Sequence, residues 1–174
     1  GRQESVAEHC WRLGLMVMCL GPQLEQAIDM EKALKMALIH DLSEAIVGDI
    51  PTWGGLSDDQ KAEKYTAELT AIQTIRESLG SAVGEEIHDL WVEFEKGDSV
   101  EAKLVFALDK LECQIQHIEA DIATWNETEK QIDYRWLDKL CDFDSTLKML
   151  KEIVREKGLE KIHADSVEST ARTT

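Results

Sequence analysis

The sequence predicts an all-α protein, a compact bundle of about six helices. Apolar residues recur at steps of three and four along most of the 174-residue chain, and no alternating strand pattern competes with them. The two prolines, Pro22 and Pro51, lie beside other helix-breaking residues and so separate predicted helices. The length suits one domain, and a composition of 43% hydrophobic and 31% charged residues is typical of a soluble globular protein.

Helix-start and helix-stop signals divide the chain into six predicted helices. They span about residues 5–20, 30–47, 57–79, 82–96, 99–122 and 136–157. The first and third begin at capping boxes, Ser5 with Glu8 and Ser57 with Gln60, in which each side chain satisfies a free backbone donor of the other residue. The second is expected to end at Gly48, because glycine readily adopts the conformation of a helix end.

The later helices depend on glycine stops and on one long apolar stripe. Gly97 is expected to end the fourth helix, and the fifth carries apolar residues at steps of three and four over residues 100–122. The sixth helix is expected to end at Gly158. The domain is therefore expected to cover residues 1–163, and residues 164–174, rich in Ser and Thr, are expected to form a disordered tail.

Charge and cysteine usage exclude several classes of protein. The chain has 19 basic and 35 acidic residues, and its net charge of -16 repels polyanions, so no long nucleic acid is expected as a partner. No apolar run approaches the roughly 18 residues of a membrane span, so no membrane partner is expected either. The four cysteines are widely spaced, which predicts reduced thiols in a cytoplasmic protein: Cys10, Cys19, Cys113 and Cys141.

Polar residues interrupt the apolar faces of three predicted helices. His9 lies on the buried stripe of the first helix, and Asp109 lies at the edge of the stripe of the fifth. In the second helix, His40, Asp41 and Glu44 share one face through their i,i+3 and i,i+4 spacing. Buried carboxylates need compensation, and two imidazoles with two carboxylates are typical of a divalent-metal site. The alternative is that each residue is an ordinary hydrogen-bonded core group.

These residues resemble the HD-domain superfamily of metal-dependent phosphohydrolases. Its pattern of a histidine, a distant His-Asp pair and a later aspartate is matched by His9, His40-Asp41 and Asp109. The motifs closely resemble the branch of HD-domain 5'-deoxyribonucleotidases, over about residues 1–121; they comprise residues 5–9, 37–44, 47–52 and 108–110. The resemblance implies a compact HD-domain helical bundle in which these four residues bind one divalent metal ion: Mn, Co, Fe, Zn or Mg.

The resemblance also implies an activity and its residues. The reaction is hydrolysis of deoxyribonucleoside 5'-monophosphates to deoxynucleoside and phosphate, with a small-molecule nucleotide as substrate. Glu44 is expected to orient the attacking water or exchange a proton with it, and Asp49 to contact the sugar or protonate the leaving 5'-oxygen. The residues expected to contact substrate are Arg2, Asp49, Ile50, Pro51, Thr52 and Trp53. Family members usually carry a further helix before the first histidine, and that helix is expected to be absent here.

Two alternative functions, one enzymatic and one non-catalytic, compete with this interpretation. A deoxynucleoside triphosphate triphosphohydrolase uses the same ligands, but it needs a cluster of cations that the sequence does not show. A non-catalytic, metal-stabilised helical binding protein has no need of Glu44 or Asp49. Family members commonly form dimers, so a homodimer is expected, and tryptophans such as Trp91 are expected at the surface.

Overall fold

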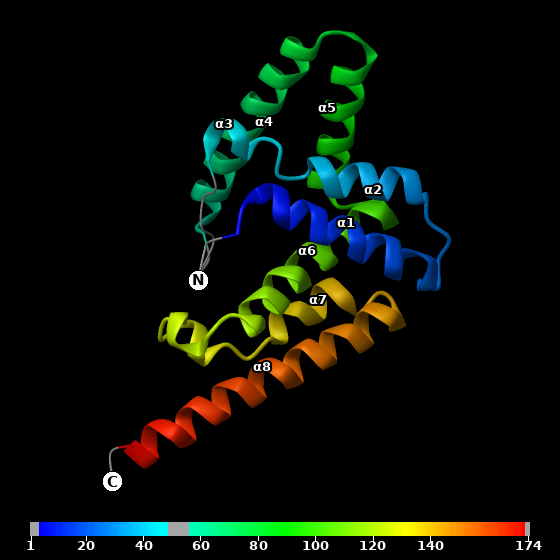
Figure 1. The fold of residues 1–174 in the computed structure, drawn as a ribbon. Helices are drawn as coiled ribbons and strands as arrows, with labels where there is room; N and C mark the ends of the chain where they lie inside the picture. Colours follow the sequence, from blue (N-terminus) through cyan, green and yellow to red (C-terminus); the bar gives the residue numbers. More distant parts are fainter. Residues whose placement is uncertain (1–3, 49–55, 173–174) are drawn as a thin grey trace.

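The computed structural model describes residues 4–48 and 56–172, all of which belong to one helical bundle (Figure 1). Six helices of ten or more residues occur in this part of the chain: α1 (Val6–Leu20), α2 (Met30–Ile39), α4 (Asp58–Leu79), α5 (Ser81–Lys96), α6 (Val100–Glu119) and α8 (Ser145–Arg172). Two four-residue helices accompany them, α3 (Glu44–Val47) and α7 (Asp138–Cys141). Short 3-10 helices cover Gly21–Gln23, Ile122–Thr124, Glu129–Gln131 and Arg135–Leu137. No strand occurs within the described ranges, so the predicted fold class is confirmed.

Most predicted helix ends agree with the structure. Both capping boxes form, with the Ser5 hydroxyl accepting from the Glu8 N–H and the Ser57 hydroxyl accepting from the Gln60 N–H. Gly48 ends α3 with a φ of 77°, and Gly97 ends α5 with a φ of 65°. Positive φ values favour glycine, which explains why these two positions end helices.

The predicted end at Gly158 is wrong, because α8 continues through it to Arg172. Gly158 is buried, and a Cβ atom built there would overlap the Tyr134 hydroxyl. This glycine therefore permits close packing and does not stop the helix. The start of the sixth helix is also wrong, since a 3-10 helix and α7 precede α8. The domain boundary at residue 163 stays a prediction.

The predicted second helix is also interrupted, because α2 ends at Ile39 and a turn covers residues 40–43. The Leu42 N–H donates to the Ile39 carbonyl at 3.0 Å, and the Glu44 N–H donates to the Asp41 carbonyl at 3.0 Å. These i,i+3 bonds tighten the backbone before α3 begins. Likewise, the fifth helix ends at Glu119 and not near residue 122.

Helix α6 is the centre of the bundle. It packs against α1, α2 and α5 on one side and against α7 and α8 on the other (Figure 1). Leu13, Met36, Leu104 and Leu108 are fully buried where α1, α2 and α6 meet. No helix among the described residues is both long and apolar enough to cross a bilayer.

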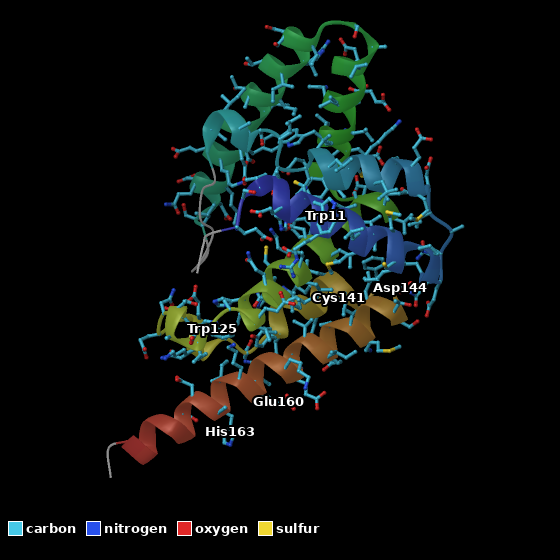
Figure 2. The ribbon with its side chains drawn as sticks, in the orientation of Figure 1. Trp11, Trp125, Cys141, Asp144, Glu160 and His163 are labelled. Atoms are coloured by element: carbon cyan, nitrogen blue, oxygen red, sulfur yellow. The ribbon has the colours of Figure 1, made fainter. Side chains whose placement is uncertain are left out.

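The expectation that Trp91 is exposed is wrong. Its side chain is fully buried, and its indole N–H donates to the His40 carbonyl at 3.1 Å. Trp11 on α1 is 65% exposed (Figure 2), and Trp136 is 40% exposed. The indole of Trp91 thus supports the turn that carries the His-Asp pair.

Candidate metal centre

Three helices bring the predicted His and Asp residues to one buried place. His9 lies in the second turn of α1, whose start is fixed by the Ser5 capping box. His40 follows the last residue of α2 and begins the turn, Asp41 is the next residue of that turn, and Asp109 lies in the middle of α6. His9, His40 and Asp109 are each less than a tenth exposed. Segments far apart in the sequence therefore supply one polar cluster inside an apolar core.

The facing atoms of this cluster lie close together. His9 Nε2 is 3.2 Å from Asp109 Oδ1 and 3.8 Å from Asp41 Oδ2, and His40 Nε2 is 3.0 Å from Asp41 Oδ2. One donor atom each from His9, His40 and Asp109 lies within 4.8 Å of the others. These separations suit donors that share one ion. The assignment of all four as ligands stays a prediction.

The orientation of both imidazoles favours a cation between them. His9 Nδ1 lies 2.6 Å from Glu112 Oε2, and His40 Nδ1 lies 3.1 Å from the Ala37 carbonyl oxygen. Each Nδ1 faces an acceptor, which fixes the proton there and turns the Nε2 lone pair toward the cluster. His40 Nε2 is buried, and its 3.0 Å approach to Asp41 Oδ2 lacks the geometry of a good hydrogen bond. Such a buried nitrogen is unusual in a folded protein, and a bound metal would satisfy it.

The electrostatics of the cluster also favour positive charge. Burial lowers the pKa of His9, but hydrogen bonds with Asp109 and Glu112 outweigh burial and raise this pKa to about 10. Burial raises the pKa of Asp109, but its hydrogen bond with His9 and the charge of Lys110 hold this pKa well below its ordinary range. The carboxylates therefore stabilise protons on the imidazoles, and a divalent cation could replace those protons.

Glu44 is the first residue of α3 and is half-buried. The sequence predicted that Glu44 lies one helical turn after His40 on the same face. Because residues 40–43 form a turn and not a helix, this i,i+4 spacing does not fix the position of Glu44. Its role stays a prediction. The remaining predicted site residues lie outside the described residues: Arg2, Asp49, Ile50, Pro51, Thr52 and Trp53.

Sequence reasoning missed several groups around the cluster. The Cys10 sulfur lies within 4.8 Å of donor atoms of His40 and Asp41, and Lys110 Nζ lies 2.8 Å from Asp109 Oδ2. Glu112, which is fully buried, contacts His9. A signal for Glu112 existed, because it follows Asp109 by three residues and falls within the apolar stripe of α6.

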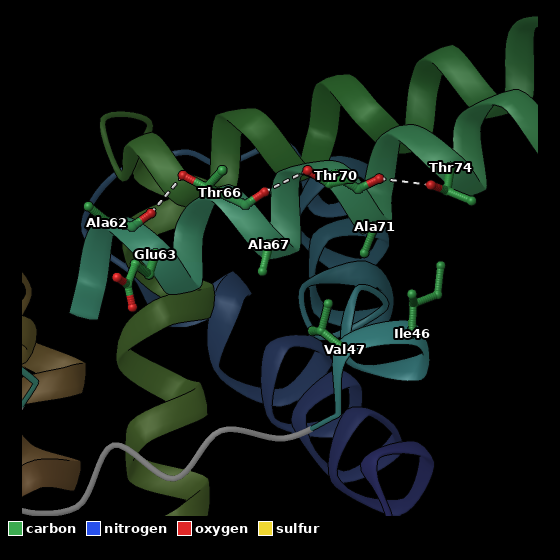
Figure 3. A pocket seen from close by; sticks show the side chains of 9 residues that line it. All are labelled: Ile46, Val47, Ala62, Glu63, Thr66, Ala67, Thr70, Ala71 and Thr74. Atoms are coloured by element: carbon green, nitrogen blue, oxygen red, sulfur yellow. Dashed lines mark hydrogen bonds between the residues drawn. The ribbon is translucent and has the colours of Figure 1, made fainter. Parts of the chain in front are cut away.

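A groove of about 630 Å³ lies between α3 and α4, apart from the cluster (Figure 3). It is lined by Ile46, Val47, Ala62, Glu63, Thr66, Ala67, Thr70, Ala71 and Thr74. The hydroxyls of Thr66, Thr70 and Thr74 each donate to the backbone carbonyl four residues earlier (Figure 3). Among the described residues, the groove wall includes one acidic side chain, Glu63, and no cation, which makes it a poor match to a phosphate group.

Known proteins are similar to this chain in sequence and in fold. The 5'-deoxynucleotidase HDDC2 of Dictyostelium discoideum is 41% identical over 121 residues, which are 67% of this chain and 62% of that protein. The 5'-deoxynucleotidase hdd1 of Schizosaccharomyces pombe is 32% identical over 90% of this chain and 77% of its own length. The chain therefore spans less than two thirds of the Dictyostelium relative.

A solved structure and a family pattern extend the comparison. The crystal structure of a predicted metal-dependent phosphohydrolase from Magnetospirillum magnetotacticum has a TM-score of 0.71 and 25% identity, covering 94% of this chain and 82% of that one. The sequence pattern of the HD domain matches residues 1–142, which include all four residues of the His and Asp cluster. This chain belongs to the HD-domain family.

Proposed function

We propose that this chain hydrolyses deoxyribonucleoside 5'-monophosphates to deoxynucleoside and phosphate, with one divalent metal ion bound by His9, His40, Asp41 and Asp109. The observation that carries the proposal is the convergence of two imidazoles and two carboxylates where α1, α2 and α6 meet. The two relatives named as 5'-deoxynucleotidases support the substrate class.

The side chains of the cluster suit a small divalent cation. Histidine nitrogens and carboxylate oxygens are donors that Mn, Co, Fe, Zn and Mg accept to different degrees. When bound, such an ion lowers the pKa of water and offsets the charge of a phosphate group. The two carboxylates of the cluster would offset the charge of the ion, and the two imidazoles would supply neutral nitrogen donors to it.

In the proposed reaction, a water oxygen bonds to phosphorus while the bond between phosphorus and the 5'-oxygen breaks. Glu44 orients the water and accepts its proton. Asp49 contacts the sugar or gives a proton to the leaving 5'-oxygen, and residues 50–53 contact the nucleoside. The proton that Glu44 takes from the water is returned through solvent, either to Asp49 after Asp49 has protonated the 5'-oxygen or to the 5'-oxygen itself. The products are therefore inorganic phosphate and a neutral deoxynucleoside.

Phosphate release by the purified protein with Mn²⁺ or Co²⁺ tests the proposal. We expect free phosphate from a deoxyribonucleoside monophosphate, less from its ribo counterpart, and none from the Asp41→Ala variant. The matched control is Asp89→Ala, which removes the exposed aspartate of the other His-Asp pair and should keep full activity. Tripolyphosphate from a deoxynucleoside triphosphate would favour the triphosphohydrolase instead, and no product from any substrate would contradict an enzymatic role.

The proposed active form is a homodimer, as the family resemblance implies, and the widely spaced cysteines favour a cytoplasmic location. Light scattering of the purified protein tests this state directly. A mass of twice 19.7 kDa is expected, and a mass of 19.7 kDa at enzyme concentrations that support activity would contradict it.

A further inference from the structure

A buried carboxylate lies directly behind one imidazole of the cluster. Glu112 follows Asp109 by one turn of α6, and its side chain is 0% exposed. Its Oε2 lies 2.6 Å from His9 Nδ1, and its Oε1 lies 2.9 Å from Arg12 Nε. A carboxylate this deeply buried is costly unless its charge is balanced. Both of its partners come from α1, so Glu112 is placed specifically against the histidine side of that helix.

The Nδ1 atoms of the two histidines of the cluster face different hydrogen-bond acceptors. His9 Nδ1 faces the charged carboxylate of Glu112, whereas His40 Nδ1 faces the neutral backbone carbonyl of Ala37. A charged acceptor forms the stronger hydrogen bond and makes the opposite nitrogen a better donor to a metal. Glu112 is therefore the side chain that fixes the orientation of His9, as the Ala37 carbonyl does for His40.

Arg12 holds Glu112 in this position. It follows His9 by one turn of α1, and its guanidinium also lies 3.8 Å from Glu4 Oε1 and 3.3 Å from Glu119 Oε2. Glu119 is 65% exposed, so a continuous series of ion pairs connects the protein surface with His9 Nδ1. The guanidinium offsets the Glu112 charge and leaves one carboxylate oxygen directed at the imidazole.

We propose that Glu112, held by Arg12, is a positioning residue that fixes His9 and sets the affinity of the cluster for a divalent metal ion. This inference depends on the proposed metal site, but not on the substrate. Outer partners of metal-binding histidines typically change metal affinity by about 10- to 100-fold. The expected effect of removing the Glu112 charge falls in this range.

Calorimetric titration with Co²⁺ tests the inference in the full chain. We expect Glu112→Gln to weaken Co²⁺ binding by about 10- to 100-fold. The matched control is Glu101→Gln, since Glu101 is also a buried acid of α6 that pairs with a cation, Lys32, at 2.8 Å, but it contacts no histidine. This control should bind Co²⁺ within about threefold of the wild type, because its partners lie outside the cluster. The visible absorption of bound Co²⁺ should change only in the Glu112 variant.

A double-mutant cycle separates positioning from general loss of structure. If Glu112 acts through His9, then Glu112→Gln should change Co²⁺ affinity by less than about threefold in a His9→Ala background. Unchanged affinity in a folded Glu112→Gln protein, or an equal loss in both backgrounds, would overturn the inference. If the Gln variant does not fold, Glu112→Asp provides a second test. Aspartate keeps the charge but is one carbon shorter, so its carboxylate moves away from His9 Nδ1 and Co²⁺ affinity should fall here too. A wild type that binds no Co²⁺ overturns the metal site itself, an outcome distinct from the others.

Discussion

Two of the described regions that bury charge balance it in opposite ways. Between α7 and α8, the Lys151 side chain is 3% exposed, and its Nζ lies 2.7 Å from Asp138 Oδ1 and 2.6 Å from Asp142 Oδ1. Those carboxylates are 41% and 46% exposed, so only the cation is buried. At the cluster of α1, α2 and α6, the side chains of Asp109 and Glu112 are themselves 8% and 0% exposed.

The presence of titratable balancing groups distinguishes the two regions. Lysine is charged at every physiological pH, so the buried Lys151 cation keeps its ion pairs with Asp138 and Asp142 without any other group. The inner carboxylates of the cluster face two permanent cations, Arg12 and Lys110, but they also face imidazoles, which carry charge only when protonated. Burial of charge alone therefore does not indicate a functional site. Buried anions that face a titratable partner indicate one more strongly, because a metal ion can replace the protons.

The largest expected difference between the two regions is in enzymatic activity. Asp109→Ala should reduce metal-dependent phosphate release by at least about 1000-fold, which corresponds to about 4 kcal/mol of transition-state stabilisation. Lys151→Met should change the rate by less than about twofold, since its ion pairs lie apart from the cluster. Steady-state phosphate assays on both folded variants measure the difference. Similar losses in the two variants would show that both regions serve only stability.

An intermediate effect concerns pH. The pKa of His9 is raised from 6.5 to about 10 in the metal-free fold. Protonated His9 therefore stabilises this fold fully below pH 6.5, and the stabilisation is lost as the pH rises through about 10. A metal ion must displace this proton, so metal affinity should rise with pH between about pH 7 and about pH 9, by up to about tenfold per unit for each proton released. Calorimetry in buffers of different ionisation enthalpy counts the protons. A pH-independent affinity would contradict this account.

The smallest expected effect concerns stability at the other region. Lys151→Met should lower the free energy of unfolding by about 1 to 3 kcal/mol, because the neighbouring carboxylates lose their shared cation but remain open to water. Lys130→Met removes a pair with Asp165 at 2.9 Å, in which the Lys130 side chain is 26% exposed, and this change should cost less than Lys151→Met. Urea unfolding measures both values. Equal costs for the two lysines would show that burial of Lys151 adds nothing to its ion pairs.

The sequence predicted those features that depend on local chemistry. Ser5 and Ser57 start helices because their side chains satisfy neighbouring backbone donors, and this requires no knowledge of the fold. His9 and Asp109 were recognised because a polar residue on an apolar helical face needs a partner. The fold class and the residues of the cluster could therefore be predicted from periodicity and burial alone.

Features that depend on packing between helices could not be predicted in this way. No glycine or proline marks a helix end before Gly48, yet the backbone tightens at residues 40–43, where the Trp91 indole supports the turn. The contact of Glu112 with Arg12 requires α1 and α6 to be adjacent, and the sequence does not give their relative placement. The prediction that Gly158 ends a helix was wrong for the same reason, since a glycine can either end a helix or make room for a neighbouring side chain.

The contact between Gly158 and Tyr134 also limits how related sequences can diverge. Any side chain at position 158 would occupy the volume of the Tyr134 hydroxyl, and a smaller residue at position 134 would leave a cavity beside α8. The two positions are thus expected to vary together during evolution. Homologues that carry a larger residue at the position of Gly158 should carry a residue smaller than tyrosine at the other.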